Sequence, residues 1–295
     1  MRSLWVNGIP VLVSVLICSL AAMAEAGPPS EQQQGNAGTA TGQFDPRDLS
    51  GIWDRKEGDQ GLSPDVPPMT PEGLARLDAN RPARGTRLGE EPRKGEHPGR
   101  ARAVVPALSN DPMMECNPQG FPRLFFQPLP VEFVHLDNRL MQFYQRERQL
   151  REIWFDGREV PSGENLDNLG LAWYGHSVGE WQGDTLVVQT VGLDDRAWLD
   201  YWGYPKSSGA RIEERYRRVD PDTLEVHLTL YDPAYYTAPW VSDTKVFRRE
   251  PPSNHTFYGW YGLFSGITEE ICAPLNEVDD FNRRVRDPAG LGNVN

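Results

Sequence analysis

The stretch YGHSVGEW contains His176, the histidine whose surroundings in the sequence are the most suitable for chemistry. Imidazole ordinarily titrates near neutral pH, so a histidine inside a cavity can serve as a general acid or base. Catalysis also requires a group that orients the ring, and two acids, Asp194 and Asp195, follow in the next loop. His176, Asp194 and Asp195 are therefore the candidate catalytic group.

The strand pattern places His176 on a β-hairpin with a two-residue turn at 183–184. This turn pairs His176 with Val191 and sends alternate side chains to opposite faces of the hairpin. One face has large apolar groups over small residues and suits a core. The other is mixed and carries Tyr174, His176 and Gln189, which fits either the lining of a ligand cavity or a half-exposed strand face.

Aromatic rings lie beside carboxylates in the loop GLDDRAWLDYWGY. Trp198 and Trp202 in this loop could close a barrel mouth over a sugar or a planar, partly apolar ligand. Alternatively the loop folds back as a plug and its rings fill core space. Arg215, on the strand that follows, either pairs with acids on a solvated face or binds a ligand carboxylate.

Several other chemistries lack the residues that they need. No H-x-H or H-x-x-x-H spacing occurs among the five histidines, and no nucleophile elbow, phosphate loop or dinucleotide fingerprint is present. We therefore expect neither a metal nor a cofactor. A glycosidase-like carboxylate pair remains an alternative, with Asp195 or Asp200 acting with Glu213 or Glu214.

The sequence around these residues predicts mainly β-strands. Turn signals at 137–138, 156–157, 183–184 and 220–222 separate segments of alternating polarity, and at least eight such segments follow one another with little helix. This pattern predicts an all-β fold, an antiparallel meander that closes into a β-barrel or packs as a sandwich. A short N-terminal helix is expected after Thr70, which is followed by proline. A short C-terminal helix is expected in NEVDDFNRRVRD.

The first residues indicate export. A charged start, a short apolar run and an A-x-A exit predict a signal peptide over 1–24, and a polar segment, 25–47, leads into the domain. One domain is expected over 48–286, with an exposed loop at 81–103 and a frayed tail at 287–295. We thus expect a periplasmic or secreted protein without a membrane segment after cleavage.

The cysteine content indicates a disulfide, and the net charge argues against some classes of binding partner. Once Cys18 leaves with the signal peptide, Cys116 and Cys272 remain, and in an oxidising compartment they predict one disulfide. The formal charge is −12, with 42 acidic and 30 basic residues, which argues against binding to nucleic acid or to an anionic membrane surface.

Several motifs, DLSGIW, CNPQGFPR, YGHSVGEWQGDTLVV, WVSD and ERYRRVDPDTLEV, together resemble a widespread family of uncharacterised exported bacterial proteins. The resemblance spans most of 48–275 and implies export, but it supplies no catalytic residues. Gly51-Ile52-Trp53 also resembles the G-x-W signature of lipocalins, in which the tryptophan closes one end of an eight-stranded barrel. That resemblance implies a lipocalin-like barrel.

The leading hypothesis is an exported β-barrel that binds a small, partly apolar or aromatic ligand in the barrel or at its mouth. In this hypothesis Tyr174, His176 and Gln189 line the site and Trp198 and Trp202 close it. A second hypothesis is a cofactor-independent lyase, isomerase, hydratase or hydrolase that uses His176 with a loop carboxylate. A third is a structural envelope protein without a cavity.

Overall fold

The computed structural model describes residues 44–55, 60–83 and 103–250, together with Cys272 and Arg284. The described part contains ten β-strands, two α-helices and four short 3-10 segments. The expected signal peptide and tail lie outside the described residues, as do nearly all of the lead-in, most of the loop at 81–103 and all of the expected C-terminal helix except Arg284.

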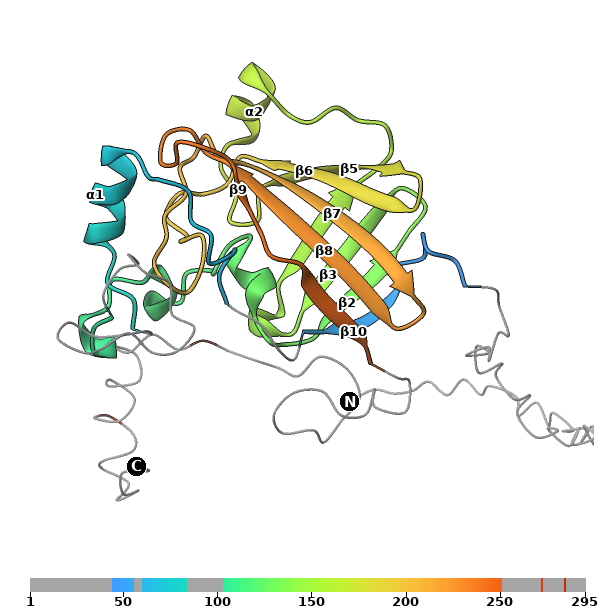
Figure 1. Cartoon of the computed structure of the whole chain (residues 1–295), viewed down its shortest axis with the longest axis horizontal. Helices are drawn as coiled ribbons and strands as arrows, with labels where there is room; N and C mark the ends of the chain where they lie inside the picture. Colours follow the sequence, from blue (N-terminus) through green and yellow to red (C-terminus); the bar gives the residue numbers. More distant parts are fainter. Residues whose placement is uncertain (1–43, 56–59, 84–102, 251–271, 273–283, 285–295) are drawn as a thin grey trace, which may run out of the picture. The chain divides into compact units, whose positions relative to one another are not determined.

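Nine strands form a closed barrel, which confirms the expectation of a mainly β fold that closes into a β-barrel (Figure 1). In chain order they are β1 (Gly51–Asp54), β2 (Val131–His135), β3 (Arg139–Tyr144), β4 (Leu150–Trp154), β5 (His176–Gln182), β6 (Thr185–Val191), β7 (Arg211–Asp220), β8 (Thr223–Tyr231) and β10 (Lys245–Arg249). The barrel closes because β10 pairs with β1 on one side and with β8 on the other. A short strand, β9 (Trp240–Val241), pairs with the other end of β8.

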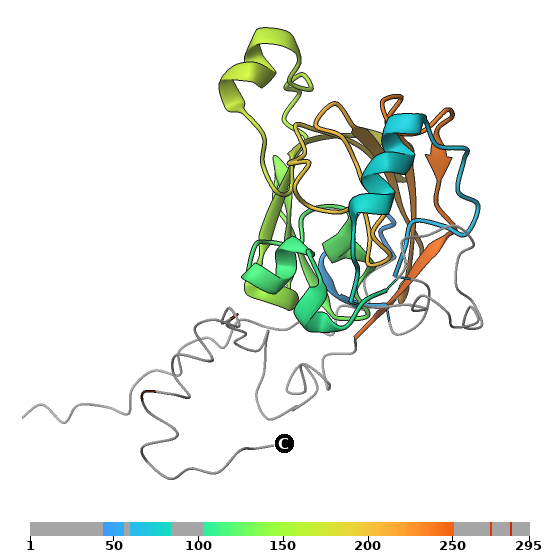
Figure 2. The same ribbon diagram turned by 90° about the vertical axis from the view of Figure 1, so that its left-hand side faces the viewer.

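One neighbouring pair departs from the expected antiparallel meander, since β4 and β5 run parallel. Parallel neighbours need a crossover connection, and here the crossover contains the helix α2 (Gly163–Leu169). Both views show α2 projecting away from the barrel (Figures 1 and 2). The pairing of β4 with β5 is short and joins Ile153 to Ser177 and Trp154 to Val178.

The hairpins have the registers that their turn residues predict. β5 and β6 pair from Gln182 with Thr185 to His176 with Val191, around the turn at 183–184. The turn at 137–138 is also confirmed, because the amide of Leu136 donates to the carbonyl of Arg139 across it. Hydrophobic alternation and turn chemistry thus determine which side chains face inward.

Side chains fill the interior of the barrel. Leu186, Val188, Leu224, Val226, Leu228 and Leu230 are buried there, from the strand faces on which apolar residues alternate. A segment before β2 adds further rings, since Phe125 packs at 4.8 Å from Phe247 and at 6.0 Å from Tyr216, measured between ring centroids. Among the described residues, the lumen is therefore a packed core.

Two expected local features outside the barrel are also present. Helix α1 (Pro71–Ala79) begins with Thr70 as its N-cap, whose side chain accepts a hydrogen bond from the amide of Gly73. Cys116 and Cys272 form a disulfide with an S–S distance of 2.07 Å. No helix in the described ranges has both the length and the apolar character needed to cross a membrane.

Candidate functional site

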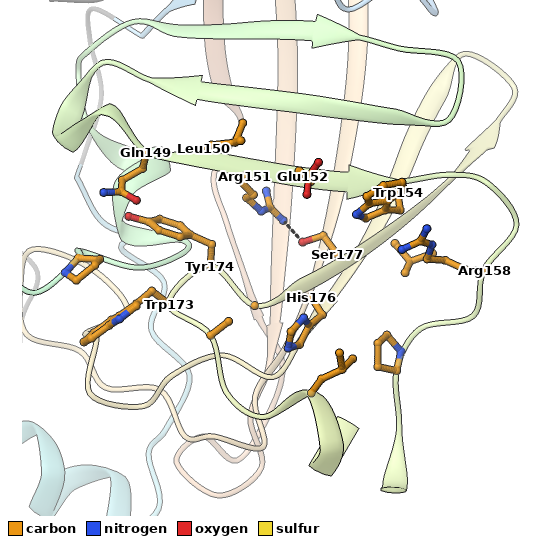
Figure 3. Close-up of a pocket in the computed structure, with 16 residues that line it drawn as sticks. Gln149, Leu150, Arg151, Glu152, Trp154, Arg158, Trp173, Tyr174, His176 and Ser177 are labelled. Carbon is orange, nitrogen blue, oxygen red and sulfur yellow. Dashed lines mark hydrogen bonds between the residues drawn. The ribbon is translucent and has the colours of Figure 1, made fainter. Parts of the chain in front are cut away.

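A cavity of about 560 Å³ lies on the outer wall of the barrel, where β4 and β5 meet. Its volume falls in the range of small-molecule sites in proteins. The residues that matter for its chemistry are Arg151, Trp154, Arg158, Trp173, Tyr174 and His176. In Figure 3, Trp154 and Arg158 stand on one side of the cavity, Trp173 and Tyr174 on the other, and His176 lies between them.

The short parallel pairing explains why the cavity opens at this place. The pairing between β4 and β5 begins at Ile153 and Ser177. The residues before Ile153 in β4 are therefore not paired with the residues before Ser177. Leu150, Arg151 and Glu152 from β4 and the segment 172–176 before and in β5 form the walls. The cavity therefore depends on the crossover topology.

Two glycines, one before β5 and one after β6, allow the backbones beside His176 to approach each other closely. Gly175 has φ of +64°, a left-handed conformation, and a Cβ there would lie 2.7 Å from the carbonyl oxygen of Val191. A Cβ at Gly192, φ of +67°, would lie 2.8 Å from Cδ2 of His176. The close approach of these backbones positions Tyr174 and His176 at the cavity.

His176 is oriented by the end of α2 rather than by a carboxylate. Its Nε2 lies 2.9 Å from the carbonyl oxygen of Gly170, the C-cap residue of α2. A carbonyl oxygen only accepts hydrogen bonds, so Nε2 must carry the proton that is donated. In neutral His176 the other ring nitrogen, Nδ1, is then an acceptor.

The charged side chains around the cavity are all paired with opposite charges. Arg151 pairs with Glu214, Glu152 with Arg139 and Arg158 with Asp156, at N–O distances of 2.6, 3.0 and 2.7 Å. Arginines also pack on the two tryptophans, with the Arg158 guanidinium 3.9 Å from the Trp154 ring centroid and that of Arg196 4.6 Å from Trp173. These contacts hold both rings in place.

Arg151 connects the floor of the cavity to a polar network inside the barrel. Its two terminal nitrogens donate to both carboxylate oxygens of Glu214, at 2.6 and 2.9 Å, and both residues are almost fully buried. The network is completed by Gln142, Tyr144, Ser177, Thr190 and Tyr216. Arg151 on β4 thereby contacts Ser177 on β5, Thr190 on β6 and Glu214 on β7, across the parallel seam.

The ionisation of this network follows from its burial and its pairing. Burial by itself lowers the pKa of Arg151, but the charge of Glu214 and its hydrogen bonds act in the other direction, and the pKa is raised. Burial raises the pKa of Tyr216, whose hydroxyl donates to Glu214 at 2.6 Å. The network therefore holds a charged Arg151 against Glu214, with both tyrosines protonated.

The structure gathers some of the sequence-predicted residues and separates others. Tyr174 and His176 both line the cavity, whereas Gln189, on the outer face of β6, hydrogen-bonds Glu213 at 2.9 Å. Arg215 is exposed and pairs with Glu213 at 3.2 Å, the arrangement that the solvated-face alternative describes. Neither Gln189 nor Arg215 belongs to the lining of the cavity.

The predicted acids are not hydrogen-bonded to His176 in the described part of the chain. Asp194 accepts hydrogen bonds from Arg196, which holds the pKa of this carboxyl below its ordinary value, and Asp195 is exposed. For the glycosidase alternative, Glu214 is bound by Arg151, and Asp200 accepts from the backbone amides of the loop. The geometry thus gives no acid–base pair centred on His176.

The aromatic loop between β6 and β7 is packed rather than open. Trp198 is buried, Trp202 is partly buried, and neither lines the cavity. The Arg123 guanidinium lies 4.2 Å from the Tyr201 ring centroid and 5.6 Å from that of Trp198, and it pairs with Asp111. In this packing the loop fills core space, as the plug alternative describes.

A buried lysine anchors the same loop. Lys206 donates from Nζ to the carbonyl oxygens of Asp194 and Ala197, the latter at 2.8 Å. Burial lowers the pKa of Lys206 to about 7, although the charges of Asp194, Asp195 and Asp232 oppose that shift. A neutral amine has enough hydrogens for both carbonyls, so the loop can be held without a buried charge.

Sequence reasoning missed Arg151 and named Glu214 only as a possible glycosidase carboxylate, whereas the two form the buried ion pair of the core. The alternation of side chains along a strand could have placed both residues on an inward face, because Arg151 lies two residues before the buried Ile153 and Glu214 two residues after the buried Ile212.

Among the described residues, no group of three or more histidine, cysteine, aspartate or glutamate side chains could hold a metal ion. No protein-family model, curated protein or solved structure matches this chain.

Proposed function

We propose that this protein is an exported binding protein for a small, partly apolar or aromatic molecule, and that the molecule binds in the outer-wall cavity between β4 and β5. The observation that carries the proposal is the cavity itself, where Tyr174 and His176 meet Trp154 and Trp173. Aromatic and apolar walls with polar groups at fixed positions are typical of small-molecule sites, and the polar groups here include Arg151, Glu152 and His176. The disulfide supports export, because disulfides persist mainly in oxidising compartments.

This proposal places the site outside the lumen, unlike the interior binding expected of a lipocalin-like barrel. The packed lumen supports that placement, because Phe121, Phe125 and the polar network occupy it. Binding is preferred to catalysis because the observed hydrogen bond of His176 goes to a backbone carbonyl. The site as described orients a ring and supplies an acceptor, which suffices for recognition.

The test is thermal unfolding of the mature protein against terpenoids, fatty acids, aromatic acids, phenols and oligosaccharides. A ligand at 100 times its Kd adds about 2.7 kcal/mol of stability, which raises the Tm of a domain of this size by roughly 5 to 10 °C. His176→Ala should reduce the stabilisation by the active compound. His227→Ala is the matched control, because His227 is exposed on β8 and does not line the cavity.

The outcomes separate clearly. A stabilising compound whose effect is lost in His176→Ala and kept in His227→Ala supports the proposed site. The proposal is wrong if no compound in the panel stabilises the protein, or if the two variants respond equally to the compound that does.

A further inference from the structure

The charges and the hydrogen-bonding state of the cavity define the class of its ligand, an inference that rests on the proposed binding function. We infer that the ligand is an uncharged hydroxyl compound with a planar or compact apolar body, and that its hydroxyl donates a hydrogen bond to Nδ1 of His176. Phenols and fused-ring alcohols belong to this class. Three observations lead to it.

The first observation is that the cavity has no uncompensated charge among its described residues. Arg151, Glu152 and Arg158 are its charged lining residues, and each has an oppositely charged partner within 3.0 Å. A ligand carboxylate or ammonium would lose hydration without gaining a free counter-charge, or it would have to displace one of these partners. A neutral ligand avoids that cost.

The second observation concerns the imidazole. Gly170 accepts from Nε2, so the proton of the neutral ring is on Nε2 and Nδ1 has a lone pair. Gly170 lies against Nε2 and Gly192 against Cδ2, and Nδ1 is on the opposite edge of the ring, without a hydrogen bond from the described residues. A lone pair selects a donor such as a hydroxyl and offers nothing to an ether.

The third observation is that the aromatic walls are held before any ligand binds. The Arg158 and Arg139 guanidiniums lie 3.9 and 4.7 Å from the ring centroid of Trp154, and Arg196 lies on Trp173. Rings fixed in this way present apolar surface at a small entropic cost. Trp154 and Trp173 lie on opposite sides of the cavity (Figure 3), and aromatic faces of this kind suit a flat apolar body such as a fused aromatic system.

The experiment compares three probes that share one body, namely 2-naphthol, 2-methoxynaphthalene and 2-naphthoate, titrated into the protein at neutral pH with calorimetric detection. We expect 2-naphthol to bind about 3- to 10-fold more tightly than its methyl ether, the ratio that one neutral hydrogen bond supports. We expect 2-naphthoate to bind at least about tenfold more weakly than 2-naphthol, because its charge finds no free partner.

Variants of His176 then assign the preference to one atom. His176→Phe keeps a ring but removes the acceptor, so the ratio between naphthol and its ether should fall to about one while the ether keeps its affinity within about twofold. His176→Gln should restore part of the ratio, because an amide can donate to Gly170 and accept from a ligand. His227→Phe should leave the ratio unchanged.

Several results would overturn this inference. Tighter binding of 2-naphthoate than of 2-naphthol would refute the neutral class, and a naphthol preference that survives in a folded His176→Phe protein would refute the role of Nδ1. If none of the three probes binds but another compound stabilises the protein through His176, the ligand class is wrong and the proposed function stands. If no compound binds at all, both are wrong.

Discussion

Removal of one charge from the Arg151–Glu214 pair should destabilise the barrel strongly, because the other charge stays buried. Arg151 and Glu214 are 1% and 0% exposed, and Glu214→Gln keeps nearly the same volume while the guanidinium loses its counter-charge. Breaking a buried pair in this way costs about 3 to 5 kcal/mol. For a domain of this size that corresponds to a fall in Tm of roughly 6 to 20 °C.

The same strand supplies a matched control. Arg215 and Glu213 form an ion pair at 3.2 Å on the outer face of β7, where Arg215 is 45% exposed. Glu213→Gln should therefore cost less than about 1 kcal/mol, the range of exposed pairs. Urea unfolding of both variants under identical conditions gives the comparison. If Glu214→Gln costs no more than Glu213→Gln, the argument that this network holds the parallel seam is refuted.

The reciprocal variant, Arg151→Met, tests how the loss of stability depends on pH. It leaves Glu214 buried without its cation, and burial without a counter-charge disfavours a charged carboxylate. The folded state then binds more protons than the unfolded state, and the deficit of Arg151→Met should shrink as the pH falls from about 8 to 5. Glu214→Gln should show no such relief, because an arginine does not release its proton in this range.

Two further predictions concern the elements that pack around the barrel. The pKa of Lys206 is about 7 in the folded state, below its unfolded value of 10.5, so between these pH values the unfolded chain binds more protons and stability should rise with pH, by on the order of 1 kcal/mol per unit. Urea unfolding at pH 7 and 9 should show this rise in the wild type and a smaller one in Lys206→Met; equal slopes would contradict it. Replacement of Cys116 and Cys272 by serine should cost about 2 to 5 kcal/mol, and reduction of the wild type should cost the same. An unchanged urea midpoint after reduction would contradict that prediction.

Much of the barrel could be predicted from local sequence because the information needed is local. Turn residues at 183–184 determined the register of β5 and β6, and alternation over 224–230 identified the inward side chains of β8. Thr70 followed by proline located the start of α1 for the same reason. In each case a few neighbouring residues settle which backbone conformation has the lowest free energy.

The parallel pairing of β4 with β5 could not be predicted in this way. The turn signal at 156–157 marked the end of a strand but not the direction of the next one, and only the packing of the whole barrel sends the chain through α2 before it returns as β5. That crossover separates the strand ends and opens the cavity beside His176. The free energy that decides this topology comes from burying surfaces that are distant in sequence, so no single segment carries the signal.

The positions of some site residues also follow from local sequence, and those of others depend on the tertiary structure. The sequence alone placed Tyr174 and His176 together on the face of the hairpin opposite its core, because side chains alternate along a strand. It could not say whether Trp198 and Trp202 would cover a ligand or fill the core, nor that Arg151 would find Glu214 inside the barrel. Those contacts join different strands and loops, and only the closed barrel brings them within the few ångströms over which burial and charge act.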